Sequence, residues 1–128
     1  MISKATSTSI QSSYFQVSFG NDRSKLRLRC NQEEFSVDFD YSKTVEKWTH
    51  IAAGVKNKRA SIFIDGEEIG FRNFNQLYVS NKEVDMAIGN QPFNGDPRGI
   101  RGFMDEVLFL KINSENEDFS IAFLNKVM

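Results

Sequence analysis

The sequence contains very few of the residues that cross-link or catalyse in small domains. Its 128 residues include one cysteine, Cys30, and one histidine, His50. A single cysteine excludes an internal disulfide and a cysteine-rich zinc site. A single histidine argues against a Ser-His-Asp triad or a histidine metal site, so we interpret His50 as a strand residue with a local hydrogen bond. These absences argue against most enzyme classes.

Long apolar runs and an excess of one charge are also absent. No apolar run approaches the ~20 residues of a membrane-spanning helix, and the first residues do not form the apolar core of a signal peptide. The 16 basic and 17 acidic side chains leave a net charge of −1. A chain with this balance has no overall basic field to attract nucleic acid or anionic lipid. We therefore expect neither a nucleic-acid partner nor a membrane span.

What the sequence does contain is a series of short alternating runs separated by turn residues. The length fits one domain, and 12 phenylalanines among 40% hydrophobic residues can fill a core. Short strands at this spacing favour an all-β sandwich. The Ser/Thr-rich residues 1–13 are expected to form a flexible tether or an edge strand, followed by a single domain over residues 14–128.

Two of these runs form the clearest hairpin candidate. Apolar residues alternate with arginine over residues 26–30 and with polar residues over 35–39, and residues 31–34 would join the two strands. In that arrangement Arg27 and Arg29 face Asp38 and Asp40 across the pair. We prefer this pairing to an anion site as the interpretation of the local basic cluster.

The end of the sequence predicts the one helix of the domain. Residues 107–110 are apolar at every position, so both faces of a strand over 103–112 should be covered. Ser114 is a candidate N-cap, and Phe119, Phe123 and Val127 recur every four residues. We therefore expect one short C-terminal helix to cover the outer side of that strand.

A family resemblance adds to this interpretation. The string KWTHIAAGVKNKRASIFIDGEEIG, residues 47–70, is similar to the central hairpin of laminin-G-like and pentraxin-like domains, where Trp-x-His precedes a strand that ends in Asp-Gly. MAIGN, a long loop and GFMDEVLFL follow in the order typical of that family. The resemblance extends over roughly residues 35–124.

The resemblance implies a concanavalin A-like jelly roll, in which two antiparallel sheets lie face to face, and an extracellular or cell-surface location. Complete members are longer, so the chain is either a minimal member or a piece truncated from a larger one at its N-terminus. From the residues themselves, we expect Trp48 to turn into the core and Asp65-Gly66 to reverse the chain. The Asp105 carboxylate should accept backbone hydrogen bonds.

The long loop over residues 90–102 is the candidate ligand site, because loops on a rigid scaffold carry most recognition chemistry. Sugar recognition needs planar hydrogen-bonding groups and an aromatic face, and this loop supplies both. The candidate binding residues are Asn90, Gln91, Phe93, Asn94, Asp96 and Arg98. Two alternatives stay open: Phe93 caps the edge of the sandwich, or the ligand binds a concave sheet through Arg27, Arg29 and Asp38.

The acidic residues support neither a strong metal site nor catalysis. Pentraxin-like members hold calcium in the loop after the Ile-Gly strand, but one carboxylate there, Asp96, is poor for an ion that takes about 6 to 8 oxygens. We expect no cofactor, with calcium as the alternative. Glucanases of this jelly roll need carboxylates about 5 to 5.5 Å apart on one face, whereas Asp105 and Glu106 are adjacent and point to opposite faces.

Two functions remain. The first is a non-catalytic, lectin-like module that recognises carbohydrate. The alternative is a protein–protein interaction or structural module of a larger extracellular or multidomain protein. An exposed edge strand would favour a homo-oligomer in that case.

Overall fold

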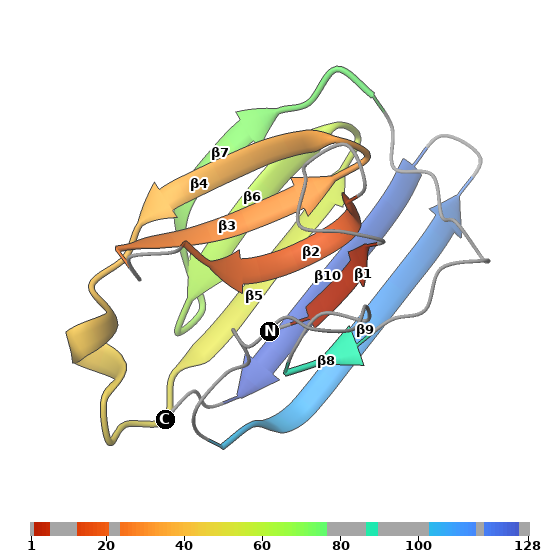
Figure 1. The fold of residues 1–128 in the computed structure, drawn as a ribbon. Coiled ribbons are helices and arrows are strands. Elements are labelled where there is room, and N and C mark those ends of the chain that lie inside the picture. Colours follow the sequence, from red (N-terminus) through yellow and green to blue (C-terminus); the bar gives the residue numbers. More distant parts are fainter. Residues whose placement is uncertain are drawn as a thin grey trace.

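The computed structural model describes residues 2–5, 13–20, 24–76, 87–89, 103–114 and 117–125. These residues form two five-stranded sheets in which every pair of neighbours is antiparallel (Figure 1). Sheet A contains β1 (Ile2–Ala5), β2 (Ser13–Phe19), β3 (Lys25–Cys30), β4 (Glu33–Asp38) and β8 (Ala87–Ile88), in the order β4-β3-β2-β1-β8. Sheet B contains β5 (His50–Lys56), β6 (Arg59–Ile64), β7 (Glu67–Asn73), β9 (Asp105–Ser114) and β10 (Glu117–Asn125), in the order β7-β6-β5-β10-β9.

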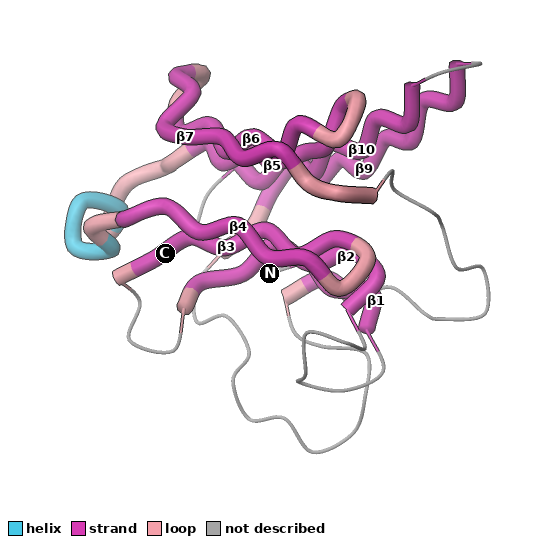
Figure 2. Tube along the Cα trace, turned by 90° about the horizontal axis from the view of Figure 1, so that it is seen from above, coloured by secondary structure: helices cyan, strands magenta, loops and turns pink. Residues whose placement is uncertain are grey.

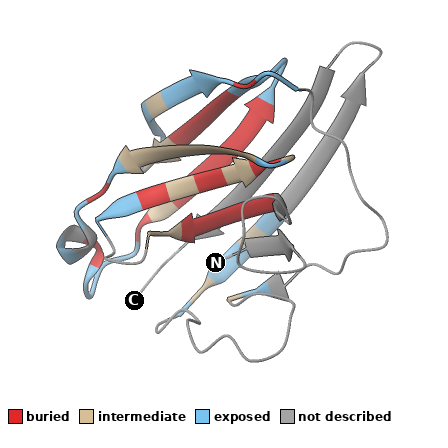
Figure 3. Ribbon diagram, turned by 45° about the horizontal axis from the view of Figure 1, so that its top comes forward, coloured by how far each residue is buried: buried red, intermediate tan, exposed pale blue. Residues whose placement is uncertain are grey.

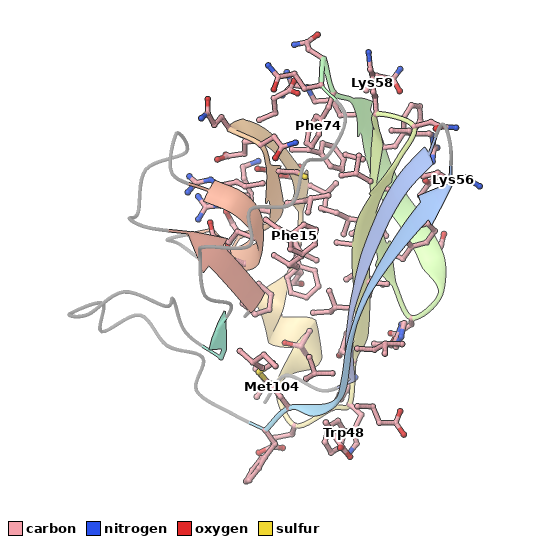
Figure 4. The ribbon with its side chains drawn as sticks, turned by 90° about the vertical axis from the view of Figure 1, so that its right-hand side faces the viewer. Phe15, Trp48, Lys56, Lys58, Phe74 and Met104 are labelled. Atoms are coloured by element: carbon pink, nitrogen blue, oxygen red, sulfur yellow. The ribbon has the colours of Figure 1, made fainter. Side chains whose placement is uncertain are left out.

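The two sheets lie face to face (Figure 2). Buried apolar side chains from both sheets form one core cluster. Alternation along each strand supplies this core: in β3, Leu26, Leu28 and Cys30 are buried while the two arginines point outward. Phe15 lies between the sheets and Phe74 closes one end of the core (Figure 4). Buried positions concentrate in β2, β3, β5 and β6, the strands at the centre of the sandwich (Figure 3). The predicted all-β sandwich is confirmed.

The β3–β4 hairpin forms as expected, but with a shorter turn. Asn31 and Gln32 both have positive φ, 48° and 72°, so two residues rather than four reverse the chain. Two consecutive left-handed residues give the turn whose twist matches that of the strands. The shorter turn brings β4 into a different register against β3.

The arginines of β3 therefore have partners other than those expected. Arg29 lies opposite Glu34 and forms an ion pair at 2.7 Å. Lys25, rather than an arginine, pairs with Asp38 at 2.8 Å. The expected partner Asp40 instead accepts a hydrogen bond from the backbone N–H of Ser42 and caps a short 3-10 helix, Tyr41–Thr44.

A second series of hairpins, β5–β6–β7, carries the segment with the family resemblance. The turn at Asp65-Gly66 has φ angles of 49° and 85°, and it reverses the chain as predicted. Its geometry is held by His50, whose backbone N–H donates to the Asp65 carboxylate at 2.9 Å and whose carbonyl accepts from the Asp65 N–H at 2.8 Å. Ile62 on β6 is fully buried, so the inner face is also as predicted.

The predicted C-terminal helix is wrong. Residues 117–125 form β10, which lies between β5 and β9 and pairs with both. The spacing of four between Phe119 and Phe123 fits a helix, but it is also twice the strand period of two. Phenylalanine and isoleucine favour strands, and the open edge of β5 offers a backbone ladder that a helix would leave unused.

Further expectations are corrected at the margins of the sandwich. Residues 2–5 form an internal strand between β2 and β8, rather than a tether or an edge strand. Trp48 is 56% exposed because it lies in the loop before β5 begins, so it does not turn into the core. On β9, Leu108 is 46% exposed, so the outer face of that strand is not fully covered. Within the described residues, no helix has the length and hydropathy needed to cross a membrane.

Candidate functional site

The loop that the sequence favours as the ligand site lies outside the described residues. The assignment of Asn90, Gln91, Phe93, Asn94, Asp96 and Arg98 therefore stays a prediction. The Asp105 carboxylate, which was expected to have a structural role, accepts the N–H of Glu106 at 2.9 Å. Across the described part of the chain, no three His, Cys, Asp or Glu side chains gather in a way that could hold a metal ion.

The alternative surface on sheet A is occupied by its own hydrogen bonds. Arg29 pairs with Glu34, and its side chain is only 12% exposed. Arg27 donates to the Ser18 hydroxyl at 3.3 and 3.4 Å. Side chains that already bind one another must exchange these bonds before they contact a ligand, which lowers the gain from binding.

The outer face of sheet B instead carries a groove of about 740 Å³ over β5 and β6. It is lined by His50, Ala52, Ala53, Gly54, Lys56, Asn57, Arg59, Ser61, Phe63, Gly66 and Asn73. In Figure 2, β7 and the far ends of β9 and β10 rise on either side of β5, so the groove lies in the hollow of a curved sheet.

Short side chains at outward positions create the floor of this groove. Alternation along β5 points Ala52 and Gly54 away from the core, and Ser61 points the same way from β6. Ala52 and Ser61 are nevertheless only 6% and 7% exposed. Phe63 lies directly opposite Ala52, and the Arg59 guanidinium donates to the Ser61 hydroxyl. A methyl, a hydrogen and a hydroxymethyl group leave a depression where other residues would fill the surface.

One wall of the groove is a fixed cluster around Arg59. Its guanidinium donates to both carboxylate oxygens of Glu68, at 2.6 and 3.0 Å, and to the Ser61 hydroxyl at 2.8 Å. The same guanidinium lies over the ring of Phe71, 4.1 Å from its centroid. Such a bidentate, stacked arginine is held more firmly than a surface lysine would be.

The charges of this cluster stabilise each other. The hydrogen bonds from Arg59, and then from Ser61, hold the pKa of the Glu68 carboxyl below its ordinary value. The hydrogen bond with Glu68 in turn raises the pKa of Arg59 above its ordinary value. Both groups are therefore ionised at neutral pH, and neither changes its charge near that pH.

Polar groups mark the two ends of the groove, which follows β5. His50 begins β5 and Lys56 ends it, with Asn57 in the turn that follows. Figure 4 shows Trp48 and Lys56 toward opposite ends of the sheet. The seven residues of β5 give the groove a length of ~20 Å. No carboxylate is among the described lining residues, so they supply no acid–base pair for glycoside hydrolysis.

Sequence inspection missed this groove, although a signal was present. Ala52, Gly54 and Ser61 are small residues at alternate positions of two neighbouring strands, and outward positions normally carry longer side chains. The family pattern contains Trp48 and Asp65-Gly66 but not these small outward residues. Recognising the groove requires the β5–β6 register, which places Gly54 directly opposite Ser61.

Comparison with known protein families gives a match over most of the chain. A laminin G-type family model, described as the concanavalin A-like lectin/glucanases superfamily, matches residues 2–117. This range includes strands β1 to β9 and ends at Glu117, the first residue of β10. Comparisons with curated proteins and with solved structures gave no significant match.

Proposed function

Because this chain belongs to the concanavalin A-like lectin/glucanase superfamily, we propose that it is a non-catalytic module that binds a glycan in the groove of sheet B. The family supports a binding module in general. The choice of a glycan is supported by one observation: an apolar floor beside an aromatic ring, bordered by planar hydrogen-bonding side chains.

Each part of this surface has a use in sugar recognition. A pyranose ring offers an apolar C–H face, which packs against an aromatic ring such as Phe63. Its hydroxyl groups both donate and accept, and the amides of Asn57 and Asn73 can do the same at the rim. The groove volume falls within the range of small-ligand sites, and its length suits an oligosaccharide rather than one sugar unit.

The superfamily includes glycosidases as well as lectins, so the non-catalytic assignment rests on the groove itself. Retaining and inverting glycosidases both place two carboxylates beside the scissile bond. Glu68, the acid of the Arg59 cluster, is held in a bidentate ion pair that keeps its pKa low, which suits neither a general acid nor a free nucleophile. We accordingly propose binding without turnover, in an extracellular or cell-surface setting.

A second candidate function is protein binding, favoured by a different observation. Large apolar side chains are exposed near the start of β5 and β9: Val45, Trp48, Phe103 and Leu108, which are 46 to 63% exposed. Exposed aromatic residues of this kind are common in protein interfaces. This surface does not use the groove, so the two functions are experimentally separable.

The test is a glycan array, read with and without calcium, for the wild type and three variants. Phe63→Ala removes the stacking ring, and binding to the captured glycans should fall about tenfold or more, in line with other aromatic contacts. Arg27→Ala, on the outer face of sheet A, is the matched control and should bind as the wild type does. The double variant Phe93→Ala/Asn94→Ala tests the long loop.

The outcomes separate the proposals. Full binding by Phe63→Ala with loss in the loop variant would move the site to residues 90–98. A folded wild type that captures no glycan would reject glycan recognition and leave protein binding. Thermal unfolding of each variant checks that lost binding is not lost folding.

A further inference from the structure

Four large apolar side chains are exposed at one end of sheet B, and we call them the Trp48 surface. They come from two segments of the chain and comprise Val45 (52% exposed), Trp48 (56%), Phe103 (63%) and Leu108 (46%). Single exposed apolar residues are ordinary, whereas a group of them marks an interaction site. Tryptophan is also enriched among the residues that dominate binding energy at interfaces.

Strand pairing brings the two segments to the same end of the sheet. Asn125 of β10 lies opposite His50 of β5 and also opposite Asp105 of β9. Because β10 is antiparallel to both neighbours, β5 and β9 run in the same direction and begin at one end, about 10 Å apart. The residues just before each start include Trp48 and Met104, which Figure 4 shows at this same end. The exposed side chains of the two segments therefore belong to one end of the sandwich.

Buried neighbours fix the backbone that carries these side chains. Thr44 and Thr49, which enclose residues 45–48, are 2% and 5% exposed. In the other segment, Met104 and Val107 pack against the hydrophobic core. The backbone of the Trp48 surface is thus fixed before a partner arrives, which lowers the ordering cost of binding.

Acidic side chains outnumber basic ones around the Trp48 surface. The β6–β7 turn lies beside the start of β5, because the Asp65 carboxylate accepts the backbone N–H of His50 at 2.9 Å. The segments at this end contain five exposed acids and two lysines: Glu46, Asp65, Glu67, Asp105 and Glu106 against Lys43 and Lys47. The whole chain, in contrast, has nearly equal numbers of acidic and basic residues. The surface therefore combines exposed apolar groups with a local excess of negative charge.

We propose that the Trp48 surface docks a basic protein segment that carries at least one large apolar side chain. This inference rests on the protein-binding candidate above and names the class of partner for it. Apolar side chains of the partner pack on Trp48 and Phe103, while its lysine or arginine residues meet the surrounding acids. An arginine can also stack on the indole ring, the best aromatic face for a cation.

The charge of this surface selects a basic segment over two other occupants. A second copy of the chain would bring the same acids against each other, and like charges across an interface lower the affinity. An anionic membrane surface would repel the acids in the same way. A partner of opposite charge gains both attraction and a faster encounter.

The test pans a library of random dodecapeptides, displayed on phage, on the immobilised chain. Phage that bind the Trp48→Ala/Phe103→Ala variant are removed first, so each retained peptide requires the Trp48 surface. Retained peptides should carry a net positive charge and at least one large apolar residue. Both substituted side chains are more than half exposed, so the variant should keep the thermal unfolding midpoint of the wild type.

The affinity of a retained peptide that contains no tryptophan is then read from the fluorescence of the chain. Trp48 is the only tryptophan, so a blue shift of its emission reports burial at this surface. Glu46→Gln and Asp105→Asn should each weaken binding about two- to fivefold, and added salt should weaken it as well. Glu34→Gln is the matched control, because it removes one charge at the start of β4, whose other end leads toward Val45. Equal affinity of all three variants would overturn the selection by charge.

The outcomes separate this inference from the functions proposed above. Retained peptides that are neutral or acidic would overturn the basic partner, while the protein-binding candidate would stand. A selection that retains no peptide would overturn both. The Trp48→Ala/Phe103→Ala variant should capture glycans as the wild type does, because neither residue lines the groove. Glycan recognition is therefore judged by the array alone.

Discussion

The two edges of sheet B are built in opposite ways. The β7 edge is rich in charge, with Glu67, Glu68 and Arg72, and the β6–β7 register shifts at a bulge between Ile62 and Phe63. The β9 edge is longer and almost uncharged beyond Glu106. Among the described strands, one edge of the sheet is therefore built from charged residues and a bulge, and the other from a nearly uncharged run that pairs with β10 alone.

Polar contacts to sheet A close the β7 side. Arg72 donates to the carbonyl of Glu34 on β4 at 2.6 Å. The Glu33 carboxylate accepts the backbone N–H groups of Asn75, at 2.9 and 3.0 Å, and of Gln76, at 3.1 Å. These bonds fix the segment that leaves β7 against the start of β4, so the two sheets cannot separate there without losing charged hydrogen bonds.

A close approach of the β7 backbone to side chains of β4 completes this closure. A Cβ atom on Gly70 of β7 would lie 2.6 Å from the Cγ1 atom of Val37 and 3.2 Å from the Phe35 ring. Only glycine lets β7 come this near to β4. The sequence thus places its one β7 glycine opposite the fully buried Ile62, where the sheets converge.

The largest effect is expected from Gly70→Ala. The added methyl group overpacks the contact with Val37, and the free energy of unfolding should fall by about 1–3 kcal/mol, measured by urea denaturation. Val37→Ala removes the clashing atom, so the double variant should lose less than the sum of the single losses. If the losses in unfolding free energy of the two single variants simply add, the methyl group added by Gly70→Ala does not clash with Val37. That result would contradict the tight contact between β7 and β4.

A smaller loss is expected from Glu33→Gln. The amide keeps one acceptor oxygen but loses the charge that strengthens the bonds to Asn75 and Gln76, so the cost should be about 1–2 kcal/mol. Hydrogen exchange at those two amides should accelerate more than exchange at the centre of β6. Glu67→Gln, an exposed acid on β7, is the control and should change stability by less than about 0.5 kcal/mol. Equal effects of the two substitutions would argue against a special role for Glu33.

The smallest effect concerns pH. Hydrogen bonds from Arg59 lower the pKa of Glu68 in the folded state. Its stabilising contribution is therefore present above the ordinary glutamate pKa and is lost as the pH falls through the lowered value. Carboxyl NMR titration should show the Glu68 pKa rising toward its ordinary value in Arg59→Gln. An unchanged titration would mean that the arginine does not hold this wall of the groove.

Local patterns in the sequence were sufficient for much of the fold. The alternation in residues 26–30, the Asp65-Gly66 turn and the family pattern after Trp48 predicted the two-sheet sandwich, because each depends on neighbours in the chain. The hairpin register depended on the left-handed pair Asn31 and Gln32, which composition alone does not reveal.

Features that depend on distant residues could not be predicted. A spacing of four between Phe119 and Phe123 satisfies a helix and a strand equally, and the open edge of β5 decides between them. Trp48 fits the family pattern, yet its exposure follows from where β5 begins. The groove depends on small residues that come from two strands in register. The ligand-binding role of residues 90–98 stays a prediction.

The position of β10 in sheet B has a consequence for how the domain is assembled. This strand is the last described in the chain, yet it lies in the interior of its sheet, between β5 and β9. During synthesis β5, β6 and β7 can pair as soon as they emerge, since short turns join them. One side of β5 must wait for residues some 70 positions later, and such distant pairings close slowly. Removing β10 would thus split the sheet through its middle, unlike the trimming of a terminal tail.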